Sequence, residues 1–186
     1  MTVLKNARLL FGVPVLSILF LIFFLLSCQG MGSKDLAPGV PVSSYQVLNL
    51  DGSNAELKDL FGKVTVVCFI ASWCESCKGE FPELNALHKK LVEKGGLVLG
   101  VALDDTIPAL RATKQEFNLE FPIVLDSQSK ARKAFKLTGF PETLVLDQNG
   151  APKLLQDVNG NLTLKFIGPR PWGQIGLESQ ILGLLG

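Results

Sequence analysis

Two apolar stretches dominate the hydrophobic pattern of the chain, and they differ in kind. The first runs from Leu9 to Leu26, eighteen residues without a charge. The second, from Val64 to Ile70, is short and rich in β-branched side chains, as is typical of a strand buried on both faces of a sheet. The chain therefore combines a hydrophobic N-terminal segment with a domain that folds around buried strands.

Beyond the N-terminal segment, the pattern predicts strands that alternate with helices. Apolar runs of strand length are separated by segments with helical spacing, such as the one that places Leu110 and Phe117 on one face. Turn signals such as Asp51-Gly52 and Gly95-Gly96 separate them. The predicted strands are 45–50, 64–70, 97–103, 122–125, 143–147 and 162–167; the predicted helices are 75–94, 107–117, 129–137 and 175–185, with a turn or short helix at 57–62.

The order of these elements predicts the fold class. Strands alternating with helices form a mostly parallel sheet covered on both faces. The last two strands follow each other after the hairpin signal at 148–150, which predicts an antiparallel edge. We expect an α/β domain over residues 41–186, with a central mixed sheet flanked by helices on both faces. Residues 28–40 are rich in Gly, Ser and Pro and are expected to form a flexible tether.

The N-terminal segment has the pattern of an export signal. Lys5 and Arg8 precede the apolar run and no acidic residue does. The sequence Leu25-Leu26-Ser27-Cys28 then resembles the bacterial lipobox, which implies a lipidated Cys28 after removal of residues 1–27. The alternative is an uncleaved membrane anchor, because the run is just long enough to span a bilayer. In either case the two basic residues stay on the cytoplasmic side, and the domain lies outside the membrane.

The charge balance gives no indication of nucleic acid or of an acidic partner. The chain has 18 Lys and Arg residues against 17 Asp and Glu residues, a formal charge of +1. Without residues 1–27 it loses two basic residues and no acidic one, and its formal charge becomes −1.

The candidate chemistry lies in the cysteines. Cys74 and Cys77 are three residues apart at the start of a predicted helix, where two thiols can close a small disulfide ring and the helix dipole favours a thiolate. A domain of this size does not need disulfide staples, so the pair is predicted to be redox-active. Half of a zinc site is the alternative, but only Cys68 and His88 remain as further ligands, and neither belongs to a close pair.

The segment from Trp73 to Cys77 resembles the active-site motif of the thioredoxin superfamily, and more narrowly its membrane-tethered, extracytoplasmic branch related to the ResA, TlpA and CcmG proteins. The resemblance covers residues 41–186. The further matching segments are Asp59-Leu60-Phe61-Gly62-Lys63, Ala71-Ser72-Trp73-Cys74, Gly139-Phe140-Pro141-Glu142-Thr143 and Asp147-Gln148-Asn149-Gly150. It implies a thioredoxin-like fold and a thiol–disulfide oxidoreductase that needs no cofactor.

The resemblance also implies roles for individual residues. Cys74 would be the attacking thiolate, and Cys77 would resolve the mixed disulfide. Pro141 matches a cis-proline opposite the CxxC motif, where the backbone of Phe140 would offer strand-like hydrogen bonds to an extended substrate. An ordinary trans turn proline is the alternative. Trp73 would shield the disulfide and contact partners, while Phe140 would belong either to that contact surface or to the core.

The proton-handling group is where this sequence departs from thioredoxin. Thioredoxins carry a buried aspartate at the position of Cys68, and in the tethered branch a glutamate at the position of Glu80 takes a similar part. Glu80 lies three residues after Cys77 on the same helical face. We expect Glu80 to handle the proton of Cys77, with a raised pKa if it is buried; a solvated helix carboxylate is the alternative. Cys68 is expected to behave as a small hydrophobe, or otherwise as a third thiol trapped with Cys77.

The predicted function is the reduction of disulfides in exported proteins, of the kind that cytochrome c maturation requires. Its partners would be protein thiols and disulfides in the cell envelope and a membrane electron donor. A copper-binding protein on the same fold is the rival, but such relatives use CxxxC with a distant histidine, whereas His88 is expected on the surface of the active-site helix. A peroxiredoxin matches less well, because its characteristic threonine and proline are replaced by Ala71 and Val67.

Overall fold

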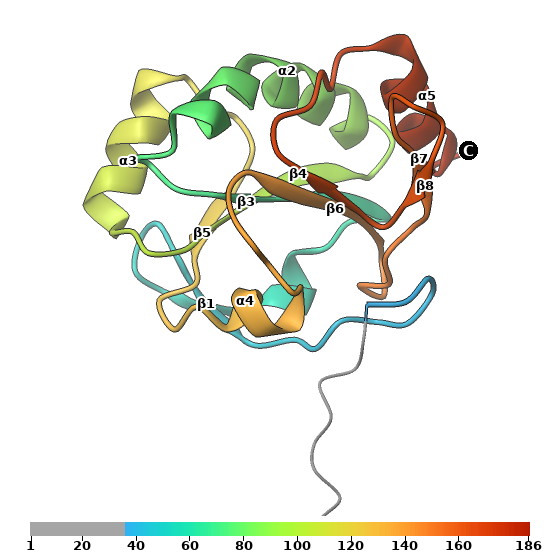
Figure 1. Cartoon of the computed structure of the whole chain (residues 1–186). Coiled ribbons are helices and arrows are strands. Elements are labelled where there is room, and N and C mark those ends of the chain that lie inside the picture. The colour runs from blue at the N-terminus through green and yellow to red at the C-terminus, as the bar shows by residue number, and fades with distance from the viewer. Residues whose placement is uncertain (1–35) are drawn as a thin grey trace, which may run out of the picture. The chain divides into compact units, whose positions relative to one another are not determined.

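The computed structural model describes residues 36–186 (Figure 1). The predicted signal segment, Cys28 and most of the tether lie outside the described residues. None of the helices within residues 36–186 has both the length and the hydrophobicity of a membrane-spanning segment.

A mixed sheet of seven strands lies at the centre of the domain, in the order β2-β1-β5-β4-β3-β6-β9. A smaller sheet pairs β7 with β8. The strands are β1 (Gln46–Asn49), β2 (Asn54–Glu56), β3 (Val64–Ile70), β4 (Leu97–Ala102), β5 (Ile123–Leu125), β6 (Glu142–Asp147), β7 (Leu155–Gln156), β8 (Leu162–Thr163) and β9 (Lys165–Ile167).

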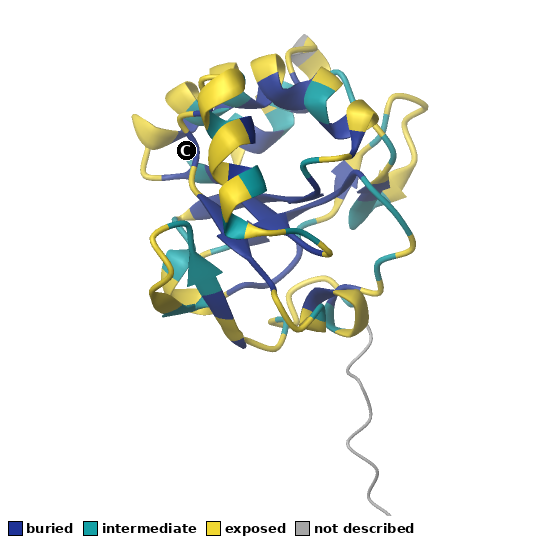
Figure 2. Ribbon diagram, turned by 90° about the vertical axis from the view of Figure 1, so that its left-hand side faces the viewer, coloured by how far each residue is buried: buried dark blue, intermediate teal, exposed yellow. Residues whose placement is uncertain are grey.

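Helices cover both faces of the large sheet (Figures 1 and 2). One face is covered by α2 (Glu75–Val92), α3 (Ile107–Glu116) and α5 (Ile175–Gly183), and the other by α4 (Lys130–Ala134) and the 3-10 helix η1 (Leu57–Leu60). Successive residues of β3 alternate between the faces, so Cys68 packs on the α2 side and Phe69 on the α4 side. All seven residues of β3 are buried, as its continuous apolar run predicts.

The α/β class and the mixed sheet with helices on both faces are confirmed. Parallel pairing is less extensive than the sequence suggests, because it joins only β3 to β4 and β4 to β5. The other four neighbouring pairs are antiparallel, so antiparallel strands lie on both sides of the parallel centre. The sequence did not predict strand β2, which forms a hairpin with β1. It is three residues long and half exposed, too short to show an alternation of apolar and polar residues.

The predicted strand 162–167 is divided in two. Its first part, β8, pairs with β7, whereas β9 is the antiparallel partner of β6 that the hairpin signal predicts. Thr163 explains the break, because its hydroxyl donates to the carbonyl of Lys165 at 2.7 Å and accepts from the Lys165 amide at 3.2 Å. These local bonds turn the chain at Leu164 and separate the two strands.

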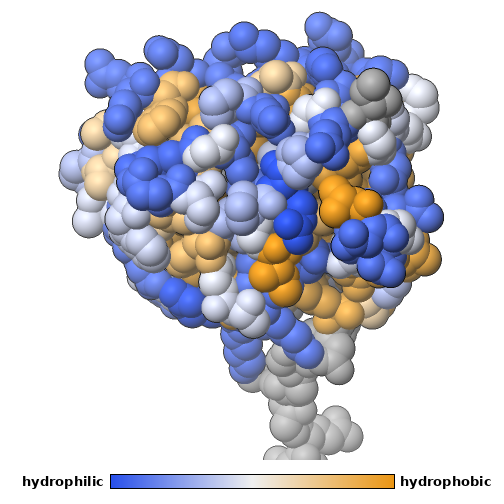
Figure 3. Space-filling model, turned by 45° about the horizontal axis from the view of Figure 1, so that its top comes forward, coloured by the Kyte–Doolittle hydropathy of each residue, from blue (hydrophilic) through white to orange (hydrophobic). Residues whose placement is uncertain are grey.

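Hydrophilic side chains predominate on the face shown in Figure 3, and apolar side chains form small, separate patches there. Large hydrophobic side chains with more than a third of their surface exposed are few in the described domain. They are Val40, Trp73, Val92, Leu154, Val158, Leu162, Ile167 and Leu184. Of these, Trp73 adjoins the CxxC motif.

Candidate active site

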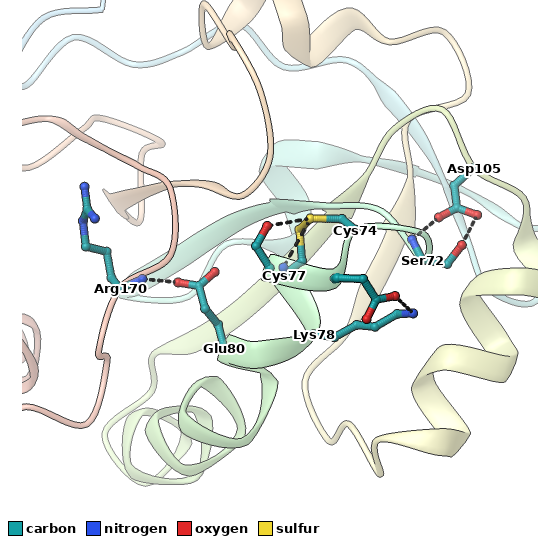
Figure 4. The surroundings of a disulfide bond; sticks show 9 residues. Ser72, Cys74, Cys77, Lys78, Glu80, Asp105 and Arg170 are labelled. Carbon is teal, nitrogen blue, oxygen red and sulfur yellow. Dashed lines mark hydrogen bonds and ion pairs between the residues drawn. A yellow bond between two sulfur atoms is a disulfide. The ribbon is translucent and has the colours of Figure 1, made fainter.

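The CxxC motif lies where β3 ends and α2 begins (Figure 4). Cys74 is the N-cap residue of α2, and Cys74 and Cys77 form a disulfide with their Cα atoms 5.3 Å apart. The backbone amide of Cys77 donates to the Cys74 sulfur at 3.2 Å. The first amides of a helix have no partner within the helix, so they favour negative charge on the Cys74 sulfur once the disulfide is reduced.

The two sulfur-bearing residues differ in access to solvent. Both are buried, but Cys74 keeps 6% of its surface exposed, whereas Cys77 keeps none. The hydroxyl of Ser76 lies 3.5 Å from the Cys74 sulfur, so a small polar group also faces that side. An incoming sulfur atom therefore reaches Cys74 first, which agrees with the expected order of an attacking and a resolving thiol.

The loop before Cys74 is fixed by the loop that follows β4. The Asp105 carboxylate accepts hydrogen bonds from the amide of Ser72 at 2.5 Å and from its hydroxyl at 2.9 Å (Figure 4). The indole Nε1 of Trp73 donates to the carbonyl of Asp104 at 3.1 Å. The sequence reasoning missed both aspartates, although two acidic residues at the carboxyl end of a strand beside the motif's strand are a usable signal.

We expect Asp105→Ala to lower the free energy of unfolding of the oxidised protein by about 1–3 kcal/mol, because several donors lose a partly buried charged acceptor. Besides Ser72, the amide of Thr106 donates to this carboxylate at 2.7 Å. Urea denaturation of the variant measures the loss. Asp59→Ala, at an exposed position in η1, is the control. Equal stabilities of the two variants would contradict this role.

Trp73 and Phe140 form an aromatic surface beside Cys74. Their rings meet edge to face with centroids 5.6 Å apart, and Trp73 is 58% exposed. The guanidinium of Arg132 lies 5.6 Å from the centroid of the Phe140 ring, and it also pairs with the carboxylate of Asp104. Phe140 is half-buried and also packs against the core. It therefore belongs both to the surface beside Cys74 and to the core.

The peptide bond between Phe140 and Pro141 is cis, as expected, and the trans alternative is wrong. Pro141 directly precedes β6, which runs antiparallel to β3 with Glu142 opposite Phe69. Because the CxxC loop leaves the same end of β3, residues 140 and 141 lie beside that loop.

Glu80 is buried on the same face of α2 as Cys77, so the alternative of a solvated carboxylate is wrong. Its Oε1 accepts hydrogen bonds from the indole of Trp172 and from the backbone amide of Arg170, each at 2.7 Å. Burial raises the pKa of Glu80, although these two hydrogen bonds oppose the rise. Both donors lie about ninety residues after Glu80, in the loop before α5. Nothing in the sequence indicates that Trp172 in this loop is buried.

Cys68 occupies the sheet position beneath this helix as a free, fully buried thiol. The hydroxyl of Thr143 lies 3.5 Å from its sulfur. Burial raises the pKa of Cys68 far above its ordinary value, and the charge of Glu80 acts in the same direction. The thiol is therefore protonated and packs as a small hydrophobe, while its capture by Cys77 stays a prediction.

His88 is half-buried rather than on the helix surface as expected. Its Nδ1 accepts a hydrogen bond from the amide of Val98 at 3.1 Å, and burial lowers its pKa. In residues 36–186, no three His, Cys, Asp or Glu side chains are grouped so that they could hold a metal ion.

The sequence profile of the AhpC/TSA family matches residues 38–151. The chain belongs to the AhpC/TSA family. Thiol-disulfide oxidoreductase ResA of Bacillus cereus (strain ATCC 10987 / NRS 248) is 31% identical over 162 residues, which cover 86% of this chain and 92% of the relative. ResA of Bacillus subtilis (strain 168) is 26% identical over 167 residues, covering 88% and 92%.

Solved structures of other proteins have a similar fold. A crystal structure from Chlorobium tepidum, described as a DsbE thiol:disulfide interchange protein, has a TM-score of 0.68 at 28% identity and covers 82% of this chain and all of that one. The thioredoxin domain of an oxidoreductase from Bacteroides vulgatus has a TM-score of 0.64 at 21% identity, a likeness in fold alone. The expected thioredoxin-like fold is confirmed, and the chain is a thiol–disulfide oxidoreductase with Cys74 and Cys77 as its CxxC pair.

In this member of the AhpC/TSA family, the predicted site residues come from distant parts of the chain. Trp73 meets Phe140 across the loops at the end of the sheet, and Glu80 is buried on the Cys77 side of α2. The lipidation candidate Cys28 lies outside the described residues.

Proposed function

We propose that this chain reduces disulfides in exported proteins on the outer side of the cytoplasmic membrane. The place of Cys74 at the N-cap of α2, with Cys77 one turn deeper, carries the proposed exchange, because it supplies one sulfur for attack and a shielded one for resolution. The relatives named ResA and DsbE support the same chemistry. The basic and apolar N-terminal pattern supports export, with anchoring through a lipid on Cys28 or through an uncleaved segment 1–27.

The reaction begins with the reduced dithiol. The Cys74 thiolate attacks one sulfur of the substrate disulfide, the substrate S–S bond breaks, and the departing sulfur takes a proton. Cys77 then loses its proton and attacks the Cys74 sulfur, which releases the second substrate thiol. Two electrons pass to the substrate, and the protein is left with the Cys74–Cys77 disulfide that the structure contains. A membrane electron donor restores the dithiol.

Glu80 is the proton carrier for the second step. Oε1 accepts the hydrogen bonds from Arg170 and Trp172, so Oε2 is the oxygen that would accept the proton of Cys77, directly or through water. A pKa raised by burial makes the carboxylate a stronger base than a solvated glutamate. Cys68, in contrast, offers no carboxylate at the corresponding place in the sheet.

Trapping in the native cell tests the proposed function. Cys77→Ser protein should accumulate mixed disulfides between Cys74 and exported proteins, which mass spectrometry identifies. The double variant with Cys74→Ser is the control and should capture none. Capture of no exported protein through Cys74 would contradict the proposal, while labelling of Cys28 with a lipid precursor distinguishes the two anchors.

A further inference from the structure

Glu142 is a buried charge that the proposed chemistry does not use. It directly follows Pro141 as the first residue of β6 and has no exposed surface. Its Oε1 accepts three hydrogen bonds, from the amide of Thr138 at 2.7 Å, the hydroxyl of Thr138 at 2.5 Å and the amide of Gly139 at 2.9 Å. One carboxylate oxygen therefore holds the backbone just before Phe140.

Lys165 completes the arrangement from the neighbouring strand β9. Its ammonium lies 2.6 Å from Oε2 of Glu142 and donates to the carbonyl of Lys136 at 2.6 Å. Burial alone would raise the pKa of Glu142, but the bonds from Lys165 and Thr138 lower it below its usual value, so this carboxyl group stays ionised. Together, Glu142 and Lys165 hold segment 136–141, which connects α4 to β6 and contains Phe140.

Stability alone does not account for such a pair. Taking a carboxylate fully and an ammonium largely out of water is costly, and apolar residues of similar size often stabilise a protein as well or better. Glu142 is buried and Lys165 is half-buried. A pair of this kind whose hydrogen bonds all go to one connecting segment is better explained by the conformation that it imposes. In this conformation the ring of Phe140 contacts Trp73 edge to face, and the guanidinium of Arg132 lies over it.

We propose that Glu142 and Lys165 are positioning residues, which fix segment 136–141 so that an extended protein substrate docks beside Cys74. The inference rests on the proposed exchange of disulfides with proteins. It distinguishes two kinds of substrate. A peptide disulfide needs the docked segment as well as the attacking sulfur, whereas hydroxyethyl disulfide is too small to use more than the sulfur.

The test compares Glu142→Gln and Lys165→Met with the unaltered protein, each reduced and mixed with either disulfide in single-turnover measurements. Glu142→Gln keeps an acceptor for Thr138 but removes the charge, and Lys165→Met keeps the apolar stem. We expect both variants to reduce the peptide disulfide about tenfold more slowly, because small displacements of a docked substrate are costly. The rate with hydroxyethyl disulfide should change by less than about twofold, since docking does not enter it.

Lys153→Met is the matched control, because it breaks the 2.7 Å pair with Asp147 at the other end of β6. It should leave both rates unchanged. Hydrogen exchange provides a local readout: the Thr138 and Gly139 amides should exchange faster in the two test variants, while the amides of Leu144 and Val145 keep their protection.

Equal losses with both disulfides, or no loss with either, would overturn the positioning role while leaving the proposed function intact. Loss of the fold in both test variants would also overturn it, because the pair would then hold the sheet rather than the segment. Failure of the unaltered protein to reduce either disulfide would instead contradict the proposed function itself.

Discussion

Cys74→Ser is expected to abolish the reduction of peptide disulfides, with a loss on the order of 10³-fold or more, because the reaction then lacks its nucleophile. Cys77 cannot replace it, since Cys77 is fully buried one helical turn further in. Cys68 is also buried, and its raised pKa keeps it protonated. Stopped-flow measurement of peptide thiol release gives the rate.

The comparison with Cys77→Ser makes this prediction specific. That variant keeps the attacking thiolate and should form the mixed disulfide at a rate close to that of the unaltered protein, but it should then stop there. A Cys74→Ser protein that still reduces the peptide, or a mixed disulfide formed on Cys77, would reverse the assigned roles.

Glu80→Gln is expected to slow the resolving step about 10²-fold near neutral pH, because a positioned base is lost. The carboxylate accepts a proton only when it is ionised, so the rate in the unaltered protein should rise with pH through the raised pKa of Glu80. The variant should lack this rise. Glu93→Gln is the matched control, since Glu93 is an exposed carboxylate at the other end of the same helix.

The same substitution should change how stability depends on pH. The pKa of Glu80 is raised in the folded state, so the folded protein binds this proton more tightly than the unfolded chain does. The free energy of unfolding of the unaltered protein therefore falls as the pH rises from the pKa of Glu80 in the unfolded chain to its pKa in the folded protein. In Glu80→Gln this group does not titrate, so this fall is absent. The stability difference between the two proteins should widen across that interval and level off above it. Parallel pH curves and equal rates would exclude Glu80 as the proton carrier.

Much of the fold follows from local sequence patterns. The continuous apolar run of β3 and the glycine-terminated helix α2 are strong signals, and the structure places both almost where the pattern predicts them. The hydrophobic pattern did not predict the very short strands. β2 and β7 contain three and two residues, too few to show periodicity, and the division of segment 162–167 depends on a local hydrogen bond of Thr163.

The site was predictable where a motif carries it and hidden where it depends on distant contacts. Cys74, Cys77 and the cis peptide before Pro141 follow from matched motifs. The environment of Glu80 does not, because burial and a bond from Trp172 arise only when the C-terminal loop packs on α2. Glu142 stands out in the sequence only as part of a matching segment, because sequence alone does not reveal that Lys165 lies opposite it.

The most direct test is one turnover of the reduced, unaltered protein with one equivalent of peptide disulfide, followed by alkylation and peptide mass spectrometry. We expect the substrate to be fully reduced, Cys74 and Cys77 to be joined, and Cys68 to be free. A peptide that stays oxidised, or a product in which Cys68 is joined to Cys77, would contradict the account of exchange through the Cys74–Cys77 pair.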